Sequence, residues 1–127
     1  MRIWLFLAAV NGAIAVLCGA FAAHGLKAVL SPDMTAVFDT GARYHLIHAL
    51  AMGVAALAIR DAPAEGARRA AIAAGLFLAG ILLFCGSLYL LALTGLGGFG
   101  FVTPLGGIAF VGGWVMLAAS ALKLEAP

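Results

Sequence analysis

Residues 3–23, IWLFLAAVNGAIAVLCGAFAA, run without a charged side chain, and this stretch decides the class of fold. About 20 apolar residues in a helix span the hydrocarbon core of a bilayer. Three further runs of spanning length follow, at approximately residues 42–59, 69–93 and 104–122. Every backbone polar group needs an internal partner in lipid, and four spans are too few to close a barrel. The sequence therefore predicts four transmembrane helices in a single all-α domain over residues 1–127.

The beginning of the first run has features of a secretory signal. Arg2 precedes it, and Ala20-Phe21-Ala22 near its end is similar to a small-residue cleavage site. The apolar core of a signal peptide is only about 7–15 residues long. Because this run is longer, we expect it to be retained as the first transmembrane helix.

The composition excludes several other classes of protein. Hydrophobic residues make up 65% of the 127 residues and charged residues only 9%, whereas a soluble domain has about a quarter charged residues. The formal net charge of +2 comes without a basic cluster interleaved with aromatic residues, so no nucleic-acid partner is expected. Two cysteines give no disulfide framework.

The connection between the first two runs, residues 24–41, mixes polar and apolar residues. Ser31-Pro32-Asp33 within it combines an N-cap residue, a proline suited to the first helical turn and an early acidic residue. We therefore expect a short amphipathic segment here, with one or two short helices lying on the periplasmic surface of the membrane.

Lysine and arginine are divided unequally between the two sides of a four-span topology. The side of Lys27 and Arg43 carries two, and the side of both termini carries five: Arg2, Arg60, Arg68, Arg69 and Lys123. Cytoplasmic loops carry the excess of positive charge. The sequence therefore predicts an inner-membrane protein with both termini in the cytoplasm.

Short motifs along the chain match one family of membrane proteins. They are residues 19–27 (GAFAAHGLK), 38–44 (FDTGARY), 48–50 (HAL), 86–89 (GSLY), 93–95 (LTG), 103–107 (TPLGG) and 113–114 (GW). With them the chain resembles, over nearly its whole length, the small four-helix bacterial family called domain of unknown function 423, which has eukaryotic transmembrane relatives. The resemblance implies a polytopic inner-membrane protein without an assigned activity. The family often has glutamine where this chain has His45, which favours His24 and His48 as ligands.

Residues 38–50, FDTGARYHLIHAL, place Arg43, Tyr44, His45 and His48 in a sequence that otherwise has the composition of a membrane span. Ionisable residues inside spans are functional candidates by default. Counting 1.5 Å of helix per residue predicts one polar layer in the outer half of the membrane. The layer comprises Cys18, His48, Cys85, Ser87 and Tyr89, with His24 and Arg43 just above it.

This layer has three interpretations. Cys18, His48 and Cys85, with His45 on the helix face of His48, have donor atoms that suit copper or zinc, although no pair has zinc-finger spacing. His24 and His48 are alternatively suited to bind haem or a quinone between helices. In the structural interpretation, Arg43 pairs with Asp39 or Asp33, and His48 hydrogen-bonds Tyr89 across helices.

Small residues recur at helix-packing intervals, as in Ala8, Gly12, Ala15, Gly19 and Ala23 on one face of the first run. Such residues let helices approach closely, which predicts tight packing within one subunit and also a homo-oligomer or a partner in a membrane complex.

The function that we expect is non-catalytic: packing with a second copy, with membrane lipid or with a larger complex. A small redox or metal- or haem-binding protein is the alternative. A transporter or pore is a second alternative, for which Asn11 is the only uncharged amide inside a span. No carboxylate lies in the middle of a span, as proton-coupled carriers usually require.

Overall fold

The computed structural model describes residues 1–124. The sequence predicts that the carboxyl terminus is in the cytoplasm, and this terminus lies outside the described residues. The chain is helical, and the described part contains no strand. Its elements are α1 (Arg2–Ala23), η1 (Leu26–Ala28), α2 (Pro32–Asp61), α3 (Ala64–Gly80), η2 (Ile81–Cys85), α4 (Gly86–Thr94), η3 (Gly97–Phe101) and α5 (Thr103–Ala121).

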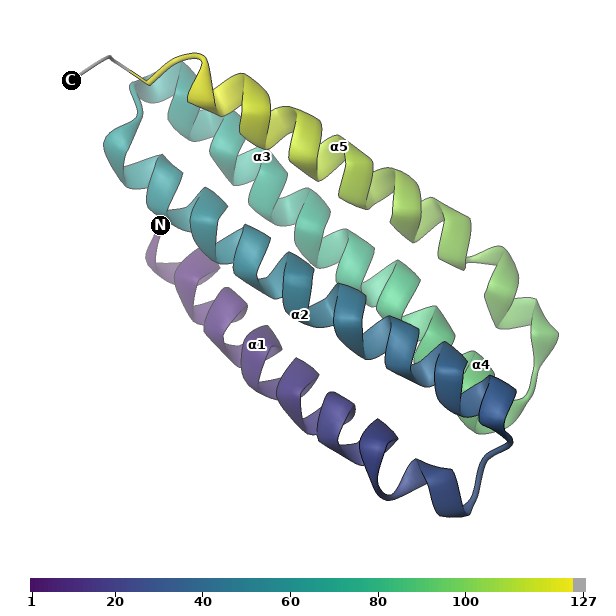
Figure 1. Ribbon diagram of the computed structural model, residues 1–127. Helices are drawn as coiled ribbons and strands as arrows, with labels where there is room; N and C mark the ends of the chain where they lie inside the picture. Colours follow the sequence, from purple (N-terminus) through teal and green to yellow (C-terminus); the bar gives the residue numbers. More distant parts are fainter. Residues whose placement is uncertain (125–127) are drawn as a thin grey trace.

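Four helical stretches are long and apolar enough to cross a membrane: Arg2–Ala28, Pro32–Asp61, Ala64–Thr94 and Gly97–Ala121. They lie side by side as long rods, and the amino terminus is at the same end as the last residues of α5 (Figure 1). This confirms the prediction of an all-α polytopic membrane protein with four spans.

The helices pack in a sequential order. α2 contacts both α1 and α3, and α5 packs mainly on α3, so α1 and α5 form opposite edges of the bundle. α1 is correspondingly exposed, with only Ala8, Ala15 and Ala22 buried. In a membrane, the exposed side chains of α1 would contact lipid or another protein.

The connection between the first two spans is shorter than the sequence predicts. Only η1 forms a separate turn, and α2 begins at Pro32 rather than near residue 42. The side-chain oxygen of Ser31 accepts a hydrogen bond from the backbone N–H of Met34 and caps the helix. Gly41 does not interrupt α2, because it is buried where the ring of Tyr89 on α4 approaches the backbone. Residues 32–41 are therefore the first turns of α2 and not one or two separate short helices.

The third span contains a π-helical turn, for which the sequence has no evident signal. η2 joins α3 to α4 without a break, and the N–H of Gly86 donates to the carbonyl of Ile81, five residues earlier. At this turn the backbone of Phe84 comes so close to Gly106 on α5 that a Cβ atom there would overlap it. π-turns of this kind are often found at functional sites.

Two buried clusters fill the interior. Cluster 1 includes Met52, Phe77, Cys85 and Phe110, and it joins α2, α3, η2 and α5. Cluster 2 includes Ala22, Leu26, Phe38 and Ala92, and it joins the end of α1, η1, the start of α2 and the end of α4. The partly buried ring of Tyr89 packs against both clusters, so it marks the boundary at which the polar side chains lie.

Candidate functional site: a polar layer around two histidines

His48 is buried in the middle of α2, and both of its ring nitrogens are hydrogen-bonded. Nδ1 is 2.7 Å from the carbonyl oxygen of Tyr44, and Nε2 is 3.2 Å from Nε1 of Trp114 on α5. A carbonyl only accepts a hydrogen bond and an indole N–H only donates one. The proton of His48 is therefore on Nδ1, and Nε2 accepts from Trp114.

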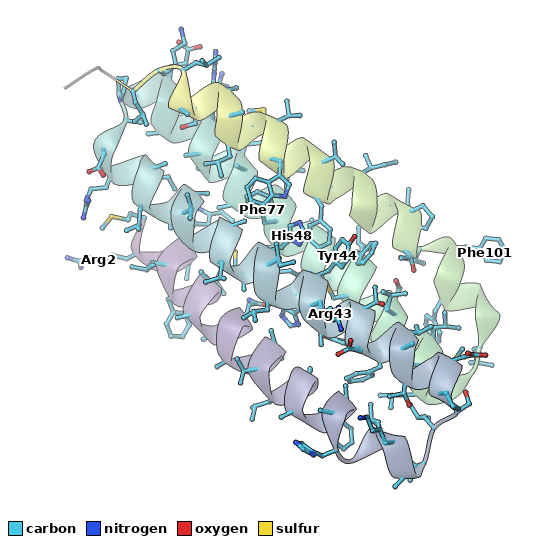
Figure 2. All side chains as sticks on the ribbon, in the orientation of Figure 1. Arg2, Arg43, Tyr44, His48, Phe77 and Phe101 are labelled. Carbon is cyan, nitrogen blue, oxygen red and sulfur yellow. The ribbon has the colours of Figure 1, made fainter. Side chains whose placement is uncertain are left out.

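Aromatic rings surround His48. Its imidazole is stacked on Phe110 with ring centroids 3.5 Å apart and an interplanar angle of 11°, and Phe77 lies 5.8 Å away between centroids. Figure 2 shows His48 and Phe77 pointing into the space between the helices. The histidine thus ties α2 to α5 through one hydrogen bond and one ring stack.

His45, three residues earlier, connects α2 to two different helices. Its Nε2 is 3.1 Å from Oδ1 of Asn11 on α1, and its Nδ1 is 3.0 Å from the hydroxyl of Tyr89 on α4. The side-chain amide nitrogen of Asn11 donates to the carbonyl of Leu7 at 2.8 Å, so the amide oxygen of Asn11 is free to accept. Nε2–H of His45 therefore donates to Asn11, and Nδ1 accepts from Tyr89.

These contacts correct one expectation about the histidines. The expected bond between His48 and Tyr89 is wrong, because Tyr89 bonds His45 and His48 bonds Trp114. Three residues on a helix leave the side chains about 60° apart around its axis, so the two rings meet different neighbours. His45, which the resemblance made the weaker candidate, has the larger interhelical network.

The other candidates lie around these two networks. Arg43 forms an ion pair with Asp39 at 2.9 Å on the exposed surface of α2. Asp39 is one of the two predicted partners. Tyr44 is 42% exposed, and its ring lies 4.7 Å from that of Phe84. His24 follows the end of α1 and is exposed, with its backbone N–H bonded to the carbonyl of Ala20. Ser87 bonds Thr103 on α5 at 2.7 Å between their hydroxyl oxygens.

The metal candidates are not assembled into a ligand set. Within residues 1–124, no group of three or more His, Cys, Asp or Glu side chains is placed to hold one metal ion. Cys85 is buried in cluster 1, whereas the half-buried Cys18 packs against cluster 2, and both are free thiols. Both ring nitrogens of His48 are used in hydrogen bonds within the chain.

Asn11 and Trp114 were not among the predicted site residues, although the sequence carried a signal for each. Asn11 is the only uncharged amide inside a span, and Trp114 follows a glycine in one of the matching motifs. Their partners were not apparent because the partners lie 34 and 66 residues away in the chain.

The fold and its interior define the class: a small helical membrane protein of four spans whose inner histidines are bonded within the chain. The family can then be given. The chain belongs to the family described as protein of unknown function (DUF423), whose model matches residues 18–107, which confirms the resemblance seen in the motifs.

Similar proteins occur in several bacteria. UPF0382 membrane protein YwdK of Bacillus subtilis is 41% identical and covers 97% of this chain and 98% of its own length. UPF0382 inner membrane protein YgdD of Escherichia coli strain K12 is 38% identical over 98% of this chain and 92% of its own. A UPF0382 membrane protein of Haemophilus influenzae is 40% identical over 94% of each. No solved structure matches the chain.

Proposed function

We propose that this chain is a non-catalytic protein of the bacterial inner membrane that acts through its outer surface. One observation carries the proposal: within residues 1–124, every buried side-chain nitrogen and oxygen has a hydrogen-bond partner in the chain itself. A site for chemistry or for a cofactor would direct polar atoms toward a ligand. Here the interior polar atoms hold α1, α2, α4 and α5 together.

The test compares two histidine variants in detergent. His48→Ala removes a hydrogen bond and a ring stack and leaves a cavity, so it should lower the free energy of unfolding by about 2–3 kcal/mol. His24→Ala is the matched control and should change little, because His24 is exposed. Purified wild-type protein should show no visible absorption band and no stoichiometric metal. A band or a metal that disappears in His48→Ala would establish the redox or metal-binding alternative.

The packing of the interior also disfavours the alternative that the chain is a transporter or pore. Cluster 1 fills the bundle with apolar side chains, among them Met52, Ala55 and Phe77, which have no exposed surface. Such packing favours a sealed interior in one chain over a polar path through it.

The surface that we propose for association with a second copy is on α1. Ala8 and Ala15 of the small-residue face are buried against the bundle, whereas a Cβ atom at Gly12 or Gly19 would meet nothing within 4 Å. Gly12 also lines a shallow apolar groove of about 390 Å³ between α1 and α2. The open glycines let a neighbouring helix approach closely.

A leucine at Gly12 distinguishes packing within the subunit from packing between two copies. Gly12→Leu has space within the subunit, so it should leave the fold intact and shift an oligomer toward monomers in light scattering. Ala13→Leu, on a neighbouring exposed position, is the control. An unchanged mass in both variants would exclude this face as the interface.

A further inference from the structure

A groove of about 560 Å³ lies where α1 ends, η1 turns and α2 begins. It is at the end of the bundle opposite the amino terminus, where the chain turns from α1 into α2 (Figure 1). Its volume is within the range of about 300–1,000 Å³ usual for small-molecule sites. None of the residues of the histidine networks lines it, so its role is separate from theirs.

The walls of the groove are mainly apolar, from residues such as Ala22, Leu30 and Ala36, with one cation and one anion among them. The cation is Lys27, which is exposed and forms no ion pair with any residue from 1 to 124. The anion is Asp39, which pairs with Arg43 through Oδ2 and leaves Oδ1 to accept from another donor. The groove therefore offers opposite charges on a hydrophobic surface.

Thr35 adds a second acceptor beside Asp39. The two residues are four apart on α2, so they lie on the same helix face. The hydroxyl of Thr35 donates to the carbonyl of Ser31 at 3.0 Å, so its oxygen can only accept a further hydrogen bond. Asp39 and Thr35 together suit a ligand group that donates several hydrogen bonds and carries positive charge.

The length of α2 places these side chains at the level of lipid headgroups. Its 30 residues make a helix about 45 Å long, whereas the hydrocarbon core is about 30 Å thick. About 7 Å of helix therefore extends beyond the core at each end. Thr35 is in the first turn of α2 and Asp39 is its eighth residue, so they lie about 4 Å and about 10 Å from the start of the helix, on either side of this boundary.

We propose that the groove binds a phospholipid with a primary ammonium headgroup, of the phosphatidylethanolamine type. Lys27 binds the phosphate, and Asp39 and Thr35 accept hydrogen bonds from the ammonium group. The alanines and Leu30 contact the glycerol end of the acyl chains. A quaternary ammonium has no N–H to donate, and phosphatidylglycerol has no cation for Asp39, so both bind less tightly.

The experiment measures lipid binding to the full chain in detergent by native mass spectrometry. Phosphatidylethanolamine, its mono-, di- and trimethylated forms and phosphatidylglycerol are compared with identical acyl chains. Affinity for the wild-type protein should fall with each methyl group and be about tenfold lower for the trimethylated lipid. Equal affinity along the series, tighter binding of phosphatidylglycerol, or no retained lipid would overturn the proposal.

Variants assign the two charges of the groove. Asp39→Asn should remove the discrimination between ethanolamine and its trimethylated form, whereas Lys27→Ala should weaken binding of every phospholipid. Lys123→Ala, at the opposite end of the bundle, is the charge-matched control and should bind as the wild type does. Preserved discrimination in folded Asp39→Asn would also contradict the proposal. The histidine networks are untouched by these changes, so either proposal can fail without the other.

Discussion

At the scale of single residues, the two interior histidines are in opposite tautomers. His45 carries its proton on Nε2 and His48 on Nδ1, because their partners fix which nitrogen donates. Each ring joins α2 to other helices. Interhelical hydrogen bonds of this kind contribute about 0.6 kcal/mol on average and rarely more than about 1.7, so the network fixes the orientation of the helices more than it supplies their stability.

Removal of one hydroxyl tests the His45 network. Tyr89→Phe keeps the ring but leaves Nδ1 of His45 without its donor, and it should lower the free energy of unfolding by about 1 kcal/mol. Tyr44→Phe is the matched control, since the Tyr44 hydroxyl has no hydrogen bond to any described residue. Thermal unfolding in detergent measures both variants. Equal midpoints for Tyr89→Phe and the wild type would show that the Tyr89 bond contributes nothing.

The sequence predicts one pairing of polar side chains correctly but not the partners of the two interior histidines. The ion pair of Arg43 with Asp39 was predictable because a four-residue spacing on a helix brings side chains together. The partners of His45 and His48 depend on how α1, α4 and α5 are rotated about their axes. Apolar composition around the whole circumference of these helices left that rotation undetermined.

At the scale of elements, α5 approaches the π-turn so closely that Gly106 has no room for a side chain. Gly106→Ala would place a Cβ atom against the backbone of Phe84, which cannot move aside as a flexible side chain can. The cost should be about 1–3 kcal/mol, as for overpacking in cores.

Gly107→Ala provides the control for this prediction. A Cβ atom at Gly107 meets only the ring edge of Phe84 at 3.9 Å, an ordinary contact, so this variant should unfold at or above the wild-type temperature. If the two alanine variants unfold together, the close contact at the π-turn is not as described.

The number of spans was predictable because apolar length alone determines it. The start of α2 was not, since the polar residues from 32 to 41 resemble a surface segment in isolation. They continue the helix because Phe38 is buried in cluster 2 and Tyr89 packs at Gly41. The π-turn likewise has no proline or other local signal in the sequence. It becomes apparent only from the contact that Gly106 of α5 makes with Phe84.

At the scale of the whole molecule, charge is divided between the two ends of the bundle. Arg69 bonds the carbonyl of Ala119 at 3.0 Å and pairs with Glu65, and Lys123 is 3.4 Å from the same carboxylate. In Figure 2, Arg2 is near this end and Arg43 is nearer the other. The proposed cytoplasmic placement of both termini follows from the positive charge at this end.

Reporter fusions test this orientation. A reporter active only in the cytoplasm should be active after Pro127 and inactive when inserted between Gly95 and Leu96, in the turn between the third and fourth spans at the opposite end of the bundle. The reverse pattern would place the termini outside. Neither insertion interrupts a spanning helix, so both fusions should reach the membrane in similar amounts, which an immunoblot checks.

The central claim is that the interior histidines are structural and bind nothing but the chain. Solid-state ¹⁵N NMR of histidine-labelled protein in lipid bilayers tests it directly, because neutral, protonated and metal-bound ring nitrogens have distinct shifts. We predict two neutral buried rings at neutral pH, protonated on Nε2 in His45 and on Nδ1 in His48, with variants at each position giving the assignment. A metal-bound or cationic signal from either ring would contradict the account.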